Sequence, residues 1–536
     1  MADVHDGIIL GGGHNGLILQ AYLARAGLDV LLLERKDTVG GGLSTLEDPS
    51  CPGFFHNTHA FFQRAITSMP WYRDLDLQSH GALYLEPELN VALLTADGRV
   101  LEWWTDFERT VESFARFSRR DADTLCRWHD EFVPIVRDIL SVEAFAPPLP
   151  PRERRELLGR TARGRRLLEV EELSPLEFVH REFEHPTLKA GLLFLNGLRE
   201  IDPRVRGFGH HIPALLASPL KAQMSKGGSA ALARALESAV RAAGGRIRTL
   251  VTPARIEVEG GRATGVTTSD GEYIRARKFV ASSLNPHQTF LELLEERHLP
   301  VEIRDRATNF QYNLIGPLFS LNLSLREAPR YTAARHHPGL NRAFMVIMGL
   351  DDVAQFSEIV RHHEEGTIPP TVMWGACPTL FDPSQAPPGR HTGFMWEKLP
   401  YRLHGDARNW DTERERHGQE MLRLWIRHAP NLGNAVLSSF TRSALDVERN
   451  FPNMRYGDLL VGAFTHGQTG YHRPFAGAGH YRGHLEGLYL CGSISHPGGN
   501  VTGLPGYNAA QVLFADLGLP AKWLPIPVKE RLSLLT

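Results

Sequence analysis

The sequence has no long apolar run, no paired cysteines and no excess of charge of one sign. Its 536 residues carry a formal net charge of −2, so nothing favours binding to nucleic acid or to acidic membranes. The four cysteines, Cys51, Cys126, Cys377 and Cys491, form no CxxC pair. This argues against a disulfide framework and a structural metal site, and makes a reducing compartment the default. A membrane-spanning helix needs about 18 apolar residues in a row, and the sequence has no such run. The first residues lack a basic stretch followed by an apolar one, so we expect no signal peptide and a cytoplasmic protein.

What the sequence does contain is a glycine cluster between two short apolar runs near its start. Residues 7–10 are typical of a buried strand, and Gly11, Gly13 and Gly16 then fit the pattern G-x-G-x-x-G. Apolar residues recur at helical spacing over 17–26, and a second apolar run ends at Glu34, 23 residues after Gly11. In such a βαβ unit the helix N-terminus receives a pyrophosphate and the carboxylate binds ribose hydroxyls. The segment therefore predicts a dinucleotide-binding site.

The residues around this unit indicate which family of dinucleotide-binding proteins the sequence resembles. The stretch "ERKDTVGGG" (34–42) resembles the E-x-R-x-x-x-G-G-R signature of the flavoprotein superfamily of phytoene desaturases and amine oxidases, where it marks FAD. Lys36 stands at the first arginine of that signature and keeps its charge, whereas Gly42 stands at the last one and removes a charge contact. The stretch "GHNGL", with His14 and Asn15, is similar to the phytoene dehydrogenase-related branch of NAD(P)/FAD-dependent oxidoreductases.

Two distant segments resemble the same family. Residues 225–282 look like the return of the chain to the FAD domain, where the backbone at Pro253 would contact the adenine through its carbonyl, since proline has no N–H. The segment from 487 onward resembles the C-terminal FAD motif, with a strand over 488–491, a glycine-rich loop over 492–506 and a helical pattern from Asn508. The resemblance implies FAD as cofactor, held by Gly11, Gly13, His14, Asn15, Gly16, Glu34, Arg35, Lys36, Gly41, Gly42, Leu43, Pro253, Gly492, Ser493, Gly503, Leu504 and Gly506.

The resemblance also implies the architecture. We expect an α/β protein with an FAD-binding, glutathione-reductase-like Rossmann-type domain built from residues 1–75, 220–292 and 455–536. Residues 76–219 and 293–454 would form a discontinuous α+β substrate domain, with the substrate cavity between the two domains. Within it, periodicity predicts helices over 106–142 and strands over 319–325 and 343–348.

An arginine-rich segment at 151–173 has two interpretations. Seven arginines alternate with leucines, as in a surface helix that docks on anionic lipid and makes peripheral membrane contact. The alternative is a solvated helical hairpin whose arginines pair with Glu153, Glu156 and Glu169. The sequence favours the second interpretation, because acidic residues are interspersed throughout the segment.

The resemblance implies hydride transfer from a substrate C–H bond to the flavin N5. Two histidines are candidates for the catalytic site, because an imidazole can change protonation near neutral pH. His59 lies in a loop that resembles the family's cover over the flavin, and His466 lies just before the C-terminal motif. A second complete G-x-G-x-x-G for a nicotinamide is missing. We therefore expect oxygen, a quinone or a protein as electron acceptor.

The leading hypothesis is an FAD-dependent desaturase or dehydrogenase acting on an apolar or cyclic small molecule. An amine oxidase and a polyene isomerase or saturase remain open within the enzyme class. A more distant alternative is a non-catalytic escort protein of the same fold. The intact glycine cluster, Glu34 and the C-terminal motif argue against the escort protein.

Overall fold

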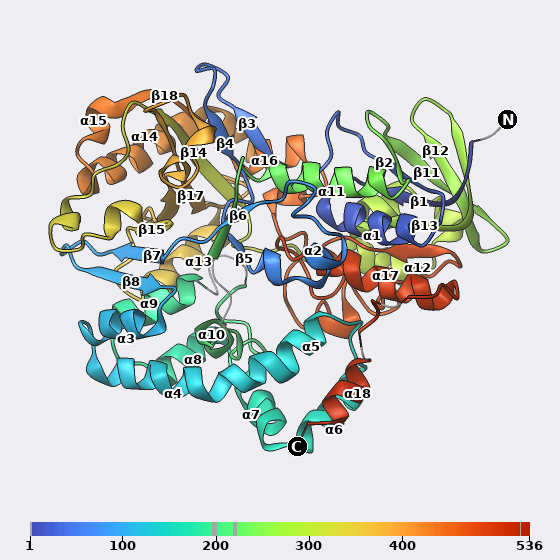
Figure 1. Cartoon of the computed structure of the whole chain (residues 1–536), viewed down its shortest axis with the longest axis horizontal. Coiled ribbons are helices and arrows are strands. Elements are labelled where there is room, and N and C mark those ends of the chain that lie inside the picture. The colour runs from blue at the N-terminus through green and yellow to red at the C-terminus, as the bar shows by residue number, and fades with distance from the viewer. Residues whose placement is uncertain (1–2, 196–200, 218–221, 522, 526, 536) are drawn as a thin grey trace.

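The computed structural model describes residues 3–195, 201–217, 222–521, 523–525 and 527–535. Two large sheets stand at opposite ends of the molecule, and a layer of helices runs below the left-hand sheet and the middle of the molecule (Figure 1). Each sheet has seven strands. None of the described helices is long and apolar enough to cross a membrane.

The first sheet contains the predicted βαβ unit. Strand β1 (Asp3–Leu10) pairs in parallel with β2 (Val30–Leu33) and with β13 (Tyr273–Ser282). β10 (Arg246–Arg248) extends the sheet beyond β2, and β19 (Leu488–Leu490) lies beside the end of β13. Parallel strands buried on both faces read as continuous apolar runs, as "VLLL" in β2 does. The expected Rossmann-type α/β fold is confirmed.

Helices cover one face of this sheet and an antiparallel hairpin extends it. The covering helices are α1 (His14–Arg25), α11 (Ala230–Ala242) and α17 (Leu504–Asp516), whose apolar side chains share one core cluster with the sheet. The hairpin is β11 (Pro253–Glu259) and β12 (Arg262–Thr268), which pairs with β13. On the other face lie η4 (His287–Glu292) and α12 (Val301–Thr308).

One helix starts earlier than the sequence pattern predicted. The sequence predicted that the glycine-rich loop ends at Gly506 and that a helix follows from Asn508. In the structure α17 begins at Leu504, so Gly506 lies inside the helix. Two residues at the start of α17 explain the difference. Gly503 adopts φ +67°, which ends the loop, and Pro505 occupies the first turn, where its missing N–H costs nothing.

The second sheet is mostly antiparallel, in the order β18-β14-β17-β16-β15-β7-β8. The predicted strands at 319–325 and 343–348 appear as β14 and β15. The bounds are β7 (Leu89–Leu94), β8 (Val100–Trp104), β14 (Leu318–Leu325), β15 (Met345–Met348), β16 (Met373–Ala376), β17 (His391–Lys398) and β18 (Val436–Arg442). Helices α13 (Gln355–Glu365), α14 (Trp410–His428), α15 (Leu432–Ala435) and α16 (Ala444–Asn450) belong to this half.

The helical layer follows β8 in the chain. The helices predicted over 106–142 are present, and the arginine-rich segment forms two short helices. The layer comprises α3 (Phe107–Ala115), α4 (Arg119–Ile135), α5 (Ser141–Ala144), α6 (Pro151–Gly159), α7 (Ala162–Glu171), α8 (Pro175–Glu182), α9 (Pro186–Leu193) and α10 (His211–Leu216). The C-terminal α18 (Val528–Ser533) lies beside α6 (Figure 1).

Short strands join the two halves. They are β3 (Thr45–Glu47) with β4 (Phe55–Asn57), and β5 (Gln63–Arg64) and β6 (Tyr84–Leu85) with β9 (Ala222–Ser225). The first sheet takes its strands from ranges predicted for the FAD-binding domain. We retain the predicted division into domains as a proposal, and its boundary between 219 and 220 lies outside the described residues.

Candidate active site

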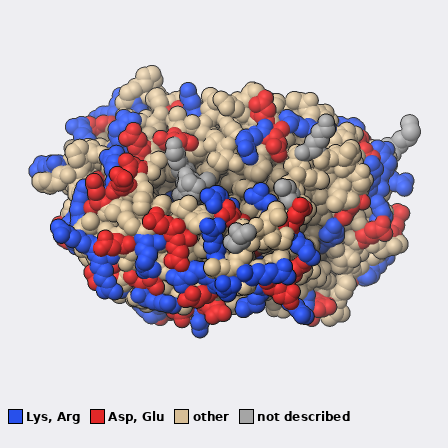
Figure 2. Space-filling model, turned by 60° about the horizontal axis from the view of Figure 1, so that its bottom comes forward, with Lys and Arg blue, Asp and Glu red and all other residues tan. Residues whose placement is uncertain are grey.

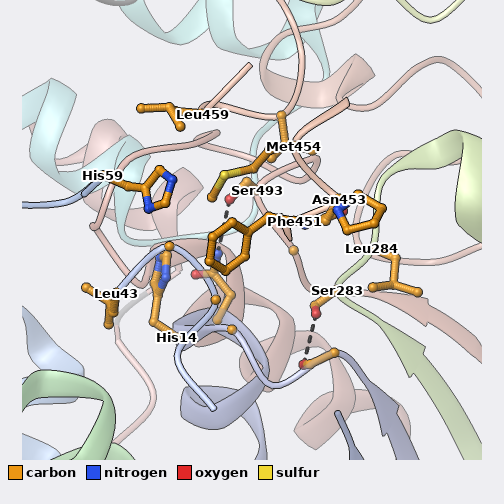
Figure 3. A pocket seen from close by; sticks show the side chains of 18 of the residues that line it. His14, Leu43, His59, Ser283, Leu284, Phe451, Asn453, Met454, Leu459 and Ser493 are labelled. Carbon is orange, nitrogen blue, oxygen red and sulfur yellow. Dashed lines mark hydrogen bonds between the residues drawn. The ribbon is translucent and has the colours of Figure 1, made fainter. Parts of the chain in front are cut away.

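A cavity of about 490 Å³ lies between the two sheets. Its wall combines the glycine turn after β1 with the C-terminal loop at Ser493 (Figure 3). Side chains from the second sheet complete it. Most of the predicted cofactor residues line it: Gly11, Gly13, His14, Asn15, Glu34, Arg35, Lys36, Gly41, Gly42, Leu43, Pro253, Gly492 and Ser493. Segments more than 400 residues apart in the chain therefore meet at one site, as the two glycine clusters predicted.

The turn between β1 and α1 is shaped to receive a phosphate group. Gly11 has φ +92°, and a Cβ there would lie 2.5 Å from Ser283 Oγ. The Ser283 hydroxyl lies 2.9 Å from the Leu10 carbonyl oxygen and 3.0 Å from that of Gly11, which fixes the turn. Gly13 is the N-cap residue of α1, so no side chain at this position occupies the first N–H groups of the helix. A Cβ at Gly13 would meet nothing within 4 Å. The first N–H groups of α1 thus open onto the cavity, as anion binding at a helix N-terminus requires.

Glu34 lies beside this turn and is held by the backbone. Its carboxylate accepts from the N–H of Gly12 at 2.8 Å and from that of Lys36 at 2.9 Å. These two bonds leave further lone pairs for ribose hydroxyls. The Lys36 ammonium lies 4.0 Å from the centre of the Phe451 ring, so this side of the cavity also carries a positive charge.

Two polar atoms beside the turn have no partner in the described structure. They are His14 Nε2 and Asn15 Oδ1, both buried. Burial lowers the pKa of His14 to about 4, so the ring is neutral at pH 7. Asn15 Nδ2 lies 3.5 Å from Ser493 Oγ and connects α1 to the C-terminal loop. Since buried polar groups normally have partners, the unsatisfied atoms together with the open helix end fit a bound dinucleotide.

Four of the predicted cofactor residues do not line the cavity. Gly16, Gly503, Leu504 and Gly506 are absent from its wall. A Cβ at Gly16 would lie 2.4 Å from the Gly11 carbonyl oxygen, and one at Gly506 would lie 2.2 Å from that of Asn15. Leu504 is buried in the core beside α1. Gly16 therefore lets helix and turn approach closely, and Gly506 does the same for the two helices.

The position of the missing arginine is occupied by another side chain. A Cβ at Gly42 would lie 2.8 Å from Met454 Cε, which also lines the cavity. The methyl end of Met454 therefore lies where a side chain at position 42 would begin.

The two candidate catalytic histidines have different surroundings. His59 lines the cavity, packs edge-to-face on Phe451 with ring centres 4.9 Å apart, and has Nδ1 2.8 Å from Thr58 Oγ1 (Figure 3). Burial, with the charges of Arg442 and Lys36, holds the pKa of His59 well below its usual value, so the ring is neutral. His466 is exposed, is absent from the cavity wall and approaches Gly207 instead.

The second sheet supplies an apolar wall that the sequence pattern missed. Trp374 in β16 and Trp396 in β17 line the cavity, and their indole rings meet edge-to-face at 6.1 Å. Phe62, from the segment between β4 and β5, lines it beside Trp396. Lys398 lines it too. It is only 5% exposed, and its Nζ donates to the Gly316 carbonyl at 2.6 Å. A lysine at the end of the buried run "TGFMWEK" is the one signal that could have drawn attention to it, because lysine is rarely buried.

Comparison with known proteins agrees with this geometry. The family described as "Flavin containing amine oxidoreductase" matches residues 16–512. One of the subunits of limonene dehydrogenase from Castellaniella defragrans is 30% identical, over 97% of this chain and 96% of that protein. The lycopene-forming phytoene desaturase of a Paracoccus species is 24% identical, over 95% and 97%. Among solved structures, cyclohexylamine oxidase from Brevibacterium oxydans superposes with a TM-score of 0.59 at 14% identity, over 96% and 99%. The chain thus belongs to the flavin-containing amine oxidoreductase family, and it is an FAD-dependent oxidoreductase.

Proposed function

We propose that this enzyme is a dehydrogenase or desaturase that removes a hydride from a C–H bond of a neutral, apolar or cyclic small molecule. The observation that carries the proposal is the division of the cavity. One end has the glycine turn and Glu34, whereas the other has an aromatic and aliphatic wall that includes Phe62, Leu318, Trp374, Trp396 and Leu459. A dinucleotide that places its ribose at Glu34 leaves the apolar end for the flavin ring and the substrate.

Charge supports a neutral substrate over an amine. Among the described residues that line the cavity, the carboxylates are Glu34 and Glu292, and both belong to the dinucleotide-binding half. The apolar wall instead carries the Lys398 ammonium, 6.0 Å from the centre of the Trp374 ring. A protonated amine would meet like charge there and no counter-ion, which is costly in a poorly solvated cavity.

The protein's own residues would then act by positioning. Bound FAD would supply the hydride acceptor. The N-terminus of α1 would hold the pyrophosphate, Glu34 the ribose, Pro253 the adenine through its carbonyl, and Ser493 the flavin end. The apolar wall would exclude water and orient the reacting C–H bond. His59, neutral and next to this end, would receive a proton where the substrate must also lose one.

We infer that residues 151–173 form a structural hairpin rather than a membrane anchor. Three leucines that would face lipid, Leu157, Leu158 and Leu167, are at most 5% exposed. Four of the seven arginines pair with carboxylates: Arg152 with Glu156, Arg154 with Glu143 and Glu171, Arg163 with Asp138, and Arg166 with Glu131 and Glu169. Acidic and basic side chains are interspersed on this face of the molecule (Figure 2).

Anaerobic bleaching of the flavin tests the proposed function. Purified enzyme is mixed without oxygen with neutral cyclic hydrocarbons, carotenoids, cyclic ketones, alcohols and amines, and absorbance of the oxidised flavin is followed. We expect neutral apolar compounds to bleach it. Bleaching by amines alone would establish an amine oxidase instead. A product formed without net acceptor consumption would indicate an isomerase. A purified protein without flavin absorbance would favour the escort protein.

The electron acceptor is tested on the bleached enzyme. We propose oxygen, a quinone or a protein, because the sequence lacks a second fingerprint for a nicotinamide. Each is added in turn, and the rate at which the flavin colour returns identifies the acceptor. Rapid reoxidation by a nicotinamide alone would contradict this part of the proposal.

A further inference from the structure

Arg473 is a buried guanidinium that the function described above leaves unused. Its side chain is 1% exposed. Within the described part of the chain it makes five hydrogen bonds, and all of them go to backbone carbonyls. Nε and Nη2 donate to Ser493 at 3.2 and 3.1 Å, Nη1 to Ala463 and Gln468 at 3.3 and 3.1 Å, and Nη2 to Gly462 at 3.2 Å.

The charge of Arg473 is not neutralised by a direct ion pair. No carboxylate lies within 4.0 Å of it in the described part of the chain. Burial lowers its pKa to about 10, while the more distant charge of Asp458 acts in the opposite direction. The side chain thus remains protonated at neutral pH. A buried cation whose hydrogen bonds go to carbonyls and not to a carboxylate is unusual, since buried charges are normally paired.

Two glycines and an aromatic ring surround the guanidinium of Arg473. A Cβ at Gly498 would lie 2.6 Å from the Phe464 ring and 3.4 Å from Arg473 Nε. Gly462 has φ +120°, and a Cβ there would lie 2.4 Å from the Phe310 ring. The Phe464 ring centre lies 4.7 Å from the guanidinium carbon. Two glycines and an aromatic face therefore create the space for one large cation.

The position of this charge relative to the cavity gives it a role. Ser493, which accepts two of the five bonds, lines the cavity, and its hydroxyl lies 3.5 Å from Asn15 Nδ2. Because the ribose site at Glu34 fixes one end of the dinucleotide, the flavin ring belongs at the Ser493 end. Reduction of a flavin adds negative charge around N1 and O2. A nearby buried cation stabilises that charge more strongly than it would in water.

We propose that Arg473 is a positioning residue that fixes the Ser493 loop against the flavin and, through its charge, makes reduction of the bound FAD more favourable. The proposal rests on the proposed placement of the flavin. In the reaction the substrate loses a hydride, the flavin gains it, and Arg473 exchanges no proton. The charge and the fork of hydrogen bonds make separable contributions, which two substitutions can distinguish.

The experiment measures the midpoint potential of bound FAD by anaerobic dye-linked titration at pH 7, together with urea unfolding. Arg473→Met removes the charge, and we expect reduction to become less favourable by about tenfold, which is about 30 mV for a two-electron couple. Arg473→Lys keeps the charge but loses the fork. This variant should unfold at a lower urea concentration than the wild type. Its equilibrium constant for reduction of the bound FAD should stay within about threefold of the wild-type value. Arg482→Met removes an exposed arginine paired with Asp516 at 2.7 Å and should change nothing.

Equal potentials for wild type and Arg473→Met, with lowered stability, would overturn the electrostatic role. If Arg473→Met does not retain FAD, the midpoint potential of FAD bound to Arg473→Lys still tests the proposal. A tenfold change in its reduction equilibrium would show that the hydrogen-bond geometry acts and the charge does not. No substrate is present in this titration, so its result is independent of the substrate panel. A failure of that panel would leave a shift in potential standing.

Discussion

Replacing Gly506 with alanine should force apart α1, which follows the glycine turn, and α17, which follows the C-terminal loop. The new Cβ would lie 2.2 Å from the Asn15 carbonyl oxygen, whereas ordinary contacts begin at 3.4 Å. α17 must therefore move by about 1 Å, and overpacking of this kind costs about 1–3 kcal/mol. The better helix propensity of alanine offsets up to about 1 kcal/mol. We expect a net loss of about 1–2 kcal/mol in the free energy of unfolding.

The same movement displaces the first turn of α1, where His14 and Asn15 face the cavity. We therefore expect FAD affinity to fall by about tenfold. Urea unfolding of the apoprotein measures the first effect, and quenching of flavin fluorescence on rebinding measures the second. Gly159→Ala is the matched control, since a Cβ at this last residue of α6 meets nothing within 4 Å. If Gly506→Ala matches the control in both measurements, the close approach of the helices does not position the cofactor site.

Three further outcomes are expected. His59→Ala should retain FAD but slow flavin reduction by a good substrate at least about tenfold in stopped-flow absorbance; an unchanged rate would remove His59 from catalysis. Burial lowers the pKa of His56 to about 4 from 6.5. Between these two pKa values His56 is protonated in the unfolded chain but neutral in the native state. The free energy of unfolding therefore falls as pH drops below 6.5, by about 2 kcal/mol near pH 5. In urea titrations His56→Gln should show a shallower fall, and an equally steep one would refute this. Reversing the charge of exposed Arg155, Arg160 and Arg165 should leave liposome co-sedimentation unchanged; a large loss would restore the membrane interpretation.

The local signals of the sequence were reliable where short-range physics sets the structure. The strand, glycine turn and helix at 7–25 follow from apolar period and from the conformational freedom of Gly11, and Glu34 lies where a ribose carboxylate is expected. The C-terminal helix was placed four residues too late, because Pro505 and Gly506 look like loop residues in isolation. Proline in a first helical turn is favourable, and Gly506 is required there by contact with Asn15.

His466 illustrates the limit of sequence adjacency. It precedes the C-terminal motif, so it was a candidate for the flavin side of the cavity, yet the structure leaves it exposed. Arg473, seven residues later, lies buried behind Ser493 instead. In a glycine-rich loop the side-chain direction depends on each backbone dihedral, and no periodic pattern encodes those angles.

The sequence by itself indicated the βαβ unit, the cofactor and the family, because their signals are local motifs, namely the glycine turn with Glu34 and the C-terminal glycine-rich loop. Only the tertiary structure decided the part of the cavity that we propose for the substrate. Trp374, Trp396 and Lys398 reach the cavity because β16 and β17 pair with each other in the second sheet. Pairing between distant strands is set by which faces bury together, and a single sequence does not specify that directly.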